Sequence, residues 1–405
     1  MLKDYKLEDT VEPLLAWFSK HARVLPWREN PTPYYVWISE IMLQQTRVEA
    51  VKPYFDRFVS ELPNAKALAE CEEDRLLKLW EGLGYYNRVR NLQIAARQIM
   101  EQFGGCIPSE YENLLQLKGI GHYTAGAIAS IAYGKPQAAV DGNVLRVISR
   151  VSGDDSDIMS TRVRGEMEAR INDLLQQYIF PENTMAATPG SHIPASKFNQ
   201  ALMELGAMVC VPNGTPHCED CPWYAICVAR REDQIARLPV KQKAKARRIE
   251  DRTVLVIRDG DRVAIQKRPD KGLLAGLYQL PNLSGHLTEA QVLEFTEKAG
   301  YRPLRVQRLD DAKHIFSHVE WHMIGYVIWV EDLTLAVEGC GHSYIALEER
   351  NQAEQANMVM TTETSGEMKG LENMLFVEAA DARERYAIPT AFSKYAAYMN
   401  IALGI

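Results

Sequence analysis

Four of the seven cysteines lie close together in the sequence, with the spacing Cys-x7-Cys-x2-Cys-x5-Cys. They are Cys210, Cys218, Cys221 and Cys227. In a reducing compartment such a group more often binds metal than forms disulfides. Four thiolates satisfy either a tetrahedral zinc ion or a four-iron, four-sulfur cluster. Zinc ribbons usually pair two Cys-x2-Cys units and only one is present here, so the spacing favours one [4Fe-4S] cluster held by the loop 210–227.

Two carboxylates stand in surroundings that could tune them for catalysis. Glu40 lies in "WISEIMLQQTRV", where a helix would place it beside apolar groups one turn away. Desolvation there would raise its pKa toward neutrality, as a general acid requires; the alternative is an ordinary glutamate on a helix surface. Asp141 lies in "AVDGNVLRVISR", just before a helical stretch. An aspartate there is also a favoured N-cap, which needs no chemistry.

A glycine turn in "LKGIGHYTAGAI" fits a helix-hairpin-helix that binds nucleic acid without reading its sequence. Gly119 and Gly121 would let backbone N–H groups approach a phosphate, and the next helix adds the positive end of its dipole. The alternative is a corner between two helices in which the glycines only relieve crowding. The residues of this stretch alone support both interpretations equally.

These groups need elements to position them, and the first 228 residues have a helical pattern with short Gly/Pro interruptions. The segment "DRLLKLWEGLGYYNRVRNLQIAARQIMEQFGG" predicts two helices around a glycine turn. The segment "PSEYENLLQLKGIGHYTAGAIASIAYG" predicts the hairpin at about 109–130, opened by a capping box of Ser109 and Glu112. We therefore expect an all-α domain over 1–228.

The composition changes after the cysteines. Residues 229–250 are basic and poor in apolar side chains, which predicts an exposed linker. Residues 251–405 then predict an α+β domain, because "RTVLVIRDGDRVAIQKR" has the pattern of a β-hairpin and "HVEWHMIGYVIWVED" that of a strand. The segments 182–196 and about 345–375 suggest no function.

Bulk properties bound the partners and the compartment. The 405 residues carry a net charge of −7, so a nucleic-acid partner must be argued from local groups. The sequence contains no run approaching the roughly 18 apolar residues of a membrane span, and no signal-peptide core. We expect a cytoplasmic monomer that does not bind membranes, associated with the nucleoid if it binds DNA.

Taken together, the motifs resemble the adenine DNA glycosylases of the MutY family. The resemblance rests on "RVLPWR", "WISEIMLQQTRV", "WEGLGYYNRVRNL", "LKGIGHYTAGAI", "VDGNVLRV" and "FNQALMELGAMVC", which occur in the family's order. More loosely, "GLLAGLYQLPN" and "HIFSHVEWHM" resemble that family's Nudix-like domain. The first cysteine gap, x7, departs from the usual x6. The implied partner is double-stranded DNA containing adenine mispaired with 8-oxoguanine or guanine.

The resemblance assigns roles to single residues. Glu40 would protonate the leaving adenine and help activate water, and Asp141 would stabilise the sugar cation. Glycosidases use two carboxyl groups in the same way, and here the adenine must first be flipped out of the helix. Tyr123 and Asn143 match positions that support the catalytic site. The positions matching the adenine pocket are Arg23, Trp27, Arg28, Leu43 and Gln200. Those matching contacts to the opposite, oxidised guanine are Gln45, Thr46, Leu83 and Tyr85, and the lesion-reading loop Phe316, Ser317 and His318.

Two features narrow the expected activity. Bifunctional relatives carry a lysine at the position of Tyr123, and a tyrosine cannot form the Schiff base, so we expect a monofunctional glycosylase. The C-terminal domain lacks the Nudix motif G-x5-E-x7-R-E-x2-E-E, so it should bind rather than hydrolyse. The alternatives are an endonuclease III-like lyase and a non-catalytic iron–sulfur DNA-binding protein. The catalytic interpretation requires Glu40 and Asp141 to converge.

Overall fold

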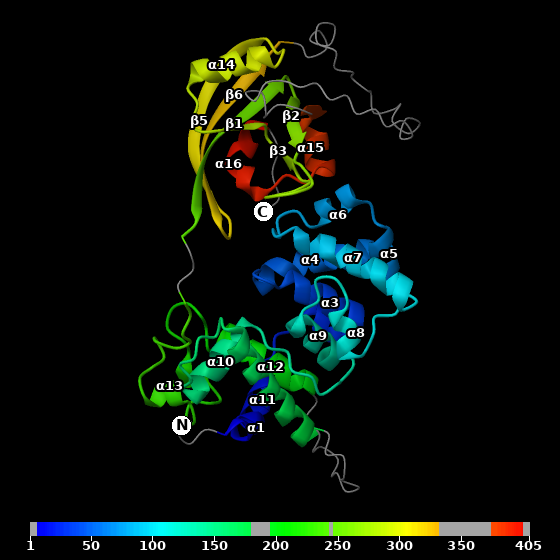
Figure 1. Cartoon of the computed structure of the whole chain (residues 1–405), viewed down its shortest axis with the longest axis vertical. Helices are drawn as coiled ribbons and strands as arrows, with labels where there is room; N and C mark the ends of the chain where they lie inside the picture. The colour runs from blue at the N-terminus through cyan, green and yellow to red at the C-terminus, as the bar shows by residue number, and fades with distance from the viewer. Residues whose placement is uncertain (1–5, 180–194, 243–245, 332–373, 400–405) are drawn as a thin grey trace. The chain divides into compact units, whose positions relative to one another are not determined.

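The computed structural model describes residues 6–179, 195–242, 246–331 and 374–399 (Figure 1). The chain forms two units, each packed around its own core. Unit one comprises Met1–Cys71 and Asn87–Ala244, and unit two comprises Glu72–Tyr86 and Lys245–Ile405. The segments 182–194 and 345–373, for which the sequence suggested no function, lie outside the described residues, as does Cys340.

Unit one is built from helices, as the sequence predicted (Figure 1). Its core joins apolar faces of helices from both ends of the unit, including Leu14, Ile148 and Leu202. In the part of the chain that the structure describes, no helix is long and apolar enough to cross a membrane. In chain order its elements are η1 Leu7–Thr10, α1 Val11–His21, α2 Pro26–Glu29, α3 Pro33–Met42, α4 Val48–Glu61, α5 Ala65–Glu70, α7 Asn87–Gln102, α8 Tyr111–Leu115, α9 His122–Ala127, η2 Ile128–Ala132, α10 Gly142–Ser152, α11 Thr161–Ile179, α12 Ala195–Met208, η3 Cys218–Asp220 and α13 Val228–Arg231.

Helix α3 is buried along most of its length. The Thr32 hydroxyl caps its N-terminus by accepting the Tyr35 N–H at 3.1 Å. At the other end, Arg88 Nη1 donates to the carbonyl oxygens of Ile41, Met42 and Gln44 at 2.7, 3.1 and 2.8 Å. A guanidinium there satisfies carbonyl groups that have no partner inside the helix and complements the negative end of its dipole.

The glycine hairpin consists of α8 and α9 around Gly119, as predicted. Gly119 has a φ of +79°, and a Cβ there would lie 2.7 Å from Cβ of Asn91, so both conformation and space require glycine. The predicted capping box is wrong. The N-cap is Glu110 and has no side-chain cap, because the helix begins one residue later than the box requires. The Ser109 hydroxyl instead contacts the Glu110 carboxylate at 3.2 Å.

Unit two contains a seven-stranded mixed sheet with the main strand order β3-β2-β1-β6-β5. The predicted hairpin is present as β1 and β2, and the predicted strand as β6. Only β1 and β6 pair in parallel among the described strands, with Val254 opposite Gly325. The strands are β1 Arg248–Asp259, β2 Arg262–Lys267, β3 Tyr278–Gln279, β4 Asn282–Ser284, β5 Pro303–Ile315, β6 Val319–Val330 and β7 Met374–Glu378.

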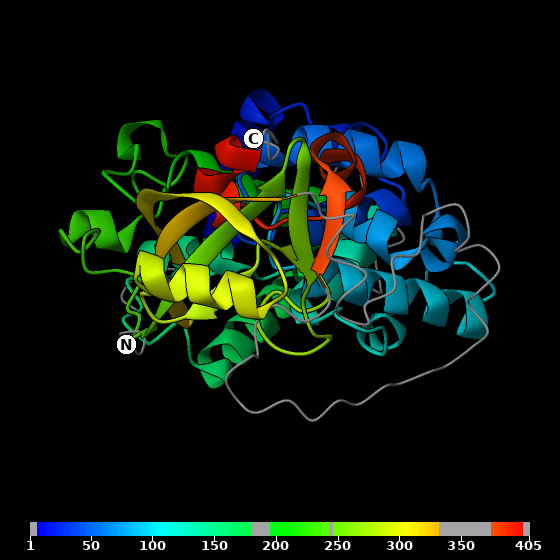
Figure 2. The ribbon, with the colours of Figure 1, turned by 90° about the horizontal axis from the view of Figure 1, so that it is seen from above.

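Helices cover both faces of this sheet (Figure 2). Successive residues of β1 point to opposite faces, so Val254 and Val256 pack with Tyr395, whereas Leu255 and Ile257 pack with the face that bears α14. The expectation of an α+β second domain is therefore confirmed. Its helices are α6 Glu73–Leu79, α14 Glu289–Lys298, α15 Ala379–Arg385, η6 Thr390–Phe392, α16 Ser393–Ala396 and η7 Ala397–Met399.

The stretch predicted as a linker, 229–250, is not uniformly exposed. Leu238 is buried in unit one, where its carbonyl oxygen accepts Arg150 Nε at 2.9 Å. The Val240 carbonyl oxygen accepts the Ile158 N–H at 3.1 Å. The first part of this stretch therefore packs on the helical unit, and β1 begins at Arg248.

Replacing Gly126 by alanine should destabilise unit one. A Cβ at this position in α9 would lie 1.9 Å from the carbonyl oxygen of Ala138, a backbone atom that cannot swing away. We expect a loss of at least about 2 kcal/mol in the free energy of unfolding. The matched control is Gly165→Ala in α11, where a Cβ meets nothing within 4 Å. That change should stabilise by about 0.5–1 kcal/mol. Urea unfolding checks both, and equal effects would contradict the close contact.

Candidate active site

The Glu40 side chain is 6% exposed, which excludes the alternative of a glutamate on a helix surface. Its Oε2 accepts a short hydrogen bond from the Tyr123 hydroxyl on α9. Burial raises the pKa of Glu40 to about 7; the nearby charge of Asp141 adds to the rise, and the Tyr123 hydrogen bond opposes it. At neutral pH this carboxyl is therefore protonated in a substantial fraction of molecules.

Asp141 is the N-cap of α10, and its carboxylate accepts the Val144 N–H at 2.8 Å. Burial raises its pKa, while the hydrogen bonds from Val144 and Asn143 lower it. Its charge also raises the pKa values of Glu40 and Tyr123, so the two carboxylates lie close enough to influence each other. Asp141 therefore caps helix α10 and also lies beside Glu40.

Asn143 connects this site to the cysteine loop. Its Nδ2 donates to Asp141 Oδ2 at 2.7 Å, and its Oδ1 accepts Arg146 Nη2 at 2.8 Å. The Nε of Arg146 donates to the carbonyl oxygen of Cys210 at 2.8 Å. A continuous series of hydrogen bonds thus runs from Asp141 to the first of the four cysteines.

Arg23 and Arg28, two of the predicted adenine-pocket residues, are held by a residue that the sequence did not single out. Glu204 on α12 is 1% exposed and accepts Nε and Nη2 of Arg23 at 2.8 Å each and Nη2 of Arg28 at 2.9 Å. Burial alone would raise the pKa of Glu204, but these hydrogen bonds lower it to about 2. The useful signal was a carboxylate in the apolar helical stretch "FNQALMELGAMVC", the same criterion that had selected Glu40.

The other predicted pocket residues also lie in unit one. Trp27 is buried, with its ring edge-on to Phe55 at 5.2 Å between centroids. Leu43 is half-buried at the C-cap of α3. Gln200 Nε2 donates to the Ser196 hydroxyl at 3.0 Å, one turn away on α12.

The residues predicted to contact the opposite guanine are divided between the two units. Gln45 and Thr46 follow α3 in unit one, where Gln45 adopts a φ of +60°. Leu83 and Tyr85 belong to unit two: Leu83 is buried, and Tyr85 is 51% exposed with a φ of +48°. Such backbone angles are uncommon for residues other than glycine and often mark functional positions.

The loop Phe316–His318 connects β5 and β6 in unit two. The Phe316 ring packs edge-on against the buried Trp321 at 5.0 Å between centroids, while Ser317 and His318 are exposed. The Phe316 N–H donates to the Val319 carbonyl oxygen at 2.8 Å. The aromatic contact therefore anchors a tight turn that presents two polar side chains to solvent.

At the glycine hairpin, Gly119 and Gly121 lead directly into α9, and Gly121 is its N-cap in extended conformation. The next residue, His122, is linked to α11 by a chain of polar contacts. The Tyr111 hydroxyl contacts His122 Nδ1 at 2.7 Å and donates to Glu168 Oε1 at 2.8 Å. The N-terminal backbone of α9 is thus held at the surface, where it could meet a phosphate.

The four clustered cysteines are free thiols that influence one another's charge. Burial raises the pKa of Cys218, Cys221 and Cys227, and the charge of Cys210 raises each further. Among the described residues, however, no three His, Cys, Asp or Glu side chains are arranged as ligands of one metal ion. The donor set of four neighbouring thiols nevertheless suits a thiolate-bound group.

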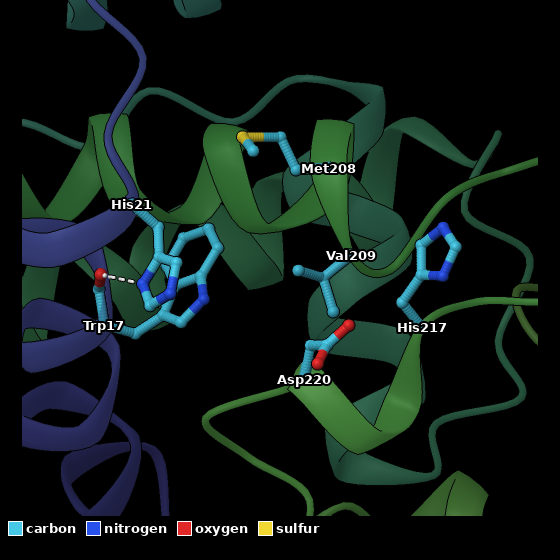
Figure 3. A pocket seen from close by; sticks show the side chains of 6 residues that line it. All are labelled: Trp17, His21, Met208, Val209, His217 and Asp220. Atoms are coloured by element: carbon cyan, nitrogen blue, oxygen red, sulfur yellow. Dashed lines mark hydrogen bonds between the residues drawn. The ribbon is translucent and has the colours of Figure 1, made fainter.

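A cavity of about 510 Å³ borders the cysteine loop, which contributes His217 and Asp220 to its lining (Figure 3). Its lining residues are Trp17, His21, Met208, Val209, His217 and Asp220. The His21 ring stacks on Trp17 and its Nδ1 contacts the Trp17 carbonyl oxygen at 2.9 Å. None of the predicted site residues lines this cavity.

Family models and curated proteins match most of the chain. Residues 38–173 match the family of HhH-GPD superfamily base excision DNA repair proteins, and residues 253–398 match the NUDIX domain family. The adenine DNA glycosylase of Mus musculus is 34% identical over 394 residues, covering 83% of this chain and 73% of the mouse protein. That of Buchnera aphidicola subsp. Baizongia pistaciae is 30% identical over 323 residues, covering 79% and 85%. The structure of a thermostable thymine-DNA glycosylase is 26% identical, with a TM-score of 0.45, covering 54% of this chain and 94% of that one.

The helical fold with its hairpin and buried carboxylates thus defines a base excision DNA repair protein of the helix-hairpin-helix class. The identity and coverage of the curated relatives go further: the chain belongs to the adenine DNA glycosylase family. It is therefore a DNA-binding hydrolase of N-glycosyl bonds. The resemblance found in the sequence is confirmed, and the two alternative functions are not favoured.

Replacing Glu40 by glutamine should stabilise the protein increasingly as the pH rises. The folded-state pKa of Glu40 is raised to about 7 from 4.5. The buried carboxyl therefore costs little stability below pH 4.5, and its cost grows until the pH passes 7. At pH 8 the variant should be more stable than the wild type by roughly 3 kcal/mol. Urea unfolding between pH 5 and 8 measures the difference, and a constant difference over this range would contradict the raised pKa.

Proposed function

We propose that the protein excises adenine paired with 8-oxoguanine, and also with guanine, as a monofunctional glycosylase. The observation that carries this proposal is the buried Glu40 with a pKa of about 7 next to Asp141. A buried carboxyl that can donate a proton, beside a second carboxyl held by hydrogen bonds from Val144 and Asn143, supplies the acid and the electrostatic stabiliser that glycosidic cleavage needs.

In this mechanism the flipped adenine receives a proton from Glu40. Because Tyr123 donates to Oε2 of Glu40, the proton to be transferred resides on Oε1. The bond between the sugar C1′ and the base then breaks, and its electron pair leaves with the protonated adenine. The Asp141 carboxylate stabilises the sugar cation, and water adds to C1′ as the ionised Glu40 takes up its proton.

Tyr123 supports this reaction by orienting the acid rather than by attacking the sugar. Burial, together with the charges of Glu40 and Asp141, raises its pKa well above the ordinary value, so its hydroxyl stays neutral and remains a donor. A phenol cannot form the imine that a lysine forms with the sugar aldehyde. The expected product is an abasic site in an uncut strand.

We further propose that Cys210, Cys218, Cys221 and Cys227 bind one [4Fe-4S] cluster. Arg146 and Arg150 support a negatively charged group here. Both are buried, at 4% and 6% exposure, and in the described part of the chain neither has a carboxylate within ion-pair distance. Arg150 Nη1 lies 3.3 Å from Sγ of Cys210. Buried guanidinium groups need opposite charge, which thiolate-bound iron and sulfide would supply while also cross-linking the loop.

Glu40→Gln should abolish adenine release and leave binding to the lesion duplex largely intact, because an amide retains the shape but has no proton to donate. Single-turnover assays with adenine opposite 8-oxoguanine, guanine or thymine measure the first effect, and gel-shift titration the second. The wild-type protein should release adenine opposite 8-oxoguanine and opposite guanine, but not opposite thymine. The control Glu12→Gln changes an exposed glutamate on α1 and should retain full activity. Substantial adenine release by Glu40→Gln would remove Glu40 from the mechanism.

Anaerobically purified protein should show the visible absorbance of an iron–sulfur cluster. Cys221→Ser should lose this absorbance because it removes a proposed ligand, whereas Cys106→Ser changes an exposed thiol outside the loop and should retain it. Metal analysis of the same samples should find iron. Stoichiometric zinc in place of iron would overturn the assignment of the cluster.

A further inference from the structure

Residues 72–86 lie within the part of the chain that matches the helical repair family, yet they pack as part of unit two. The chain leaves unit one after Cys71 and returns to it at Asn87. This segment contains α6, the glycine turn and Tyr85. The segment forms hydrogen bonds and ion pairs with residues that come roughly two hundred to three hundred positions later in the sequence.

The central contact is a half-buried ion pair whose members also hold the backbone of unit two. Lys78 Nζ and Glu81 Oε2 are 2.6 Å apart, and the two side chains are 14% and 12% exposed. Lys78 Nζ also donates to the carbonyl oxygen of Tyr386 at 3.1 Å. The Oε1 of Glu81 accepts the N–H of the buried Ile388 at 2.8 Å. The Lys78 ammonium thus faces a backbone carbonyl oxygen, and the Glu81 carboxylate faces a backbone N–H.

A second contact lies at the start of α6. Asp74 Oδ1 accepts Nζ of Lys267 at 3.0 Å, and its Oδ2 accepts the Tyr278 hydroxyl at 3.3 Å. The Tyr278 ring packs edge-on against Tyr386 at 4.6 Å between centroids. The contacts of Asp74 and of Lys78 therefore meet at the same aromatic pair.

The glycine turn that follows ends at a residue proposed to contact the lesion. Gly82 and Gly84 have φ values of +98° and +68°, and the buried Trp80 fixes the turn by donating Nε1 to the Gly84 carbonyl oxygen at 3.1 Å. Tyr85 follows with its own unfavourable φ of +48°. The Tyr85 hydroxyl oxygen accepts a hydrogen bond from the Ser317 hydroxyl at 3.3 Å. A strained residue keeps one orientation only where its surroundings determine it.

We propose that Lys78 and Glu81 are positioning residues that fasten the segment 72–86 to unit two and thereby hold Tyr85 beside Ser317. The two hydroxyls then form one preassembled reader for an oxidised guanine. This inference rests on the proposed function, because the oxidised guanine comes from it. Lesion recognition would therefore depend on the ion pair that fastens the segment as well as on the two hydroxyls.

The test compares Glu81→Ala with Glu81→Gln in the full-length protein. The alanine variant should lower the ratio of adenine-release rates opposite 8-oxoguanine and opposite guanine about fivefold to tenfold, because the Ile388 N–H and Lys78 lose their partner. It should also speed hydrogen exchange at the Ile388 amide. Glutamine keeps an acceptor for that amide and should restore much of both properties.

Exchanging the two charged residues distinguishes the effect of their backbone contacts from the effect of the ion pair itself. Lys78→Glu combined with Glu81→Lys restores the pair but turns a carboxylate toward the Tyr386 carbonyl and an ammonium toward the Ile388 N–H. It should therefore behave like Glu81→Ala. The matched control exchanges Lys66 and Glu70, an exposed pair on α5, and should leave ratio and exchange unchanged.

Several results would overturn the proposal. They are a restored ratio in the exchanged variant, an unchanged ratio in Glu81→Ala, or faster exchange at Ile388 without any change in the ratio. A wild-type protein that releases adenine without preferring 8-oxoguanine would instead defeat the proposed substrate. In that case the exchange measurements would still report whether Glu81 holds Ile388, so the two failures can be distinguished.

Discussion

The desolvation of one carboxyl group, that of Glu40, is the constraint on which unit one depends. A helix that carries this group must be enclosed on several sides, and α3 is in contact with α4, α9 and η2. Its ends are satisfied by the Thr32 hydroxyl and the Arg88 guanidinium. Enclosure raises the proton affinity of Glu40, and the hydrogen bond from Tyr123 offsets part of the cost of burial.

A second buried carboxyl in the same unit has the opposite protonation state. Glu204 is surrounded by donors from Arg23 and Arg28 and stays ionised, whereas Glu40 has a neutral phenol as its partner and is protonated in a substantial fraction of molecules at neutral pH. The difference arises from the charge of the partners rather than from burial, which both share. Glu204 thus remains an anion that positions Arg23 and Arg28, whereas Glu40 can donate and accept a proton near neutral pH.

Local patterns predicted the helical unit, the glycine hairpin and the strands β1, β2 and β6, because period and turn residues reflect contacts between neighbours in sequence. The apolar surroundings of Glu40 and the N-cap position of Asp141 were visible in the same way. The role of Glu204 was not, since Arg23 lies 181 positions away. The packing of 72–86 with unit two was also invisible, because its amphipathic pattern is that of any helix.

The segment 72–86 also has a consequence for how the protein is made. On the ribosome it emerges long before its partners, since Glu81 and Ile388 are separated by 307 positions. Until those partners are synthesised, Lys78 lacks the Tyr386 carbonyl oxygen and Glu81 lacks the Ile388 N–H. Contacts of such high sequence separation form late and slowly. The contacts that fasten this segment to the second unit can therefore form only after nearly the whole chain has been synthesised.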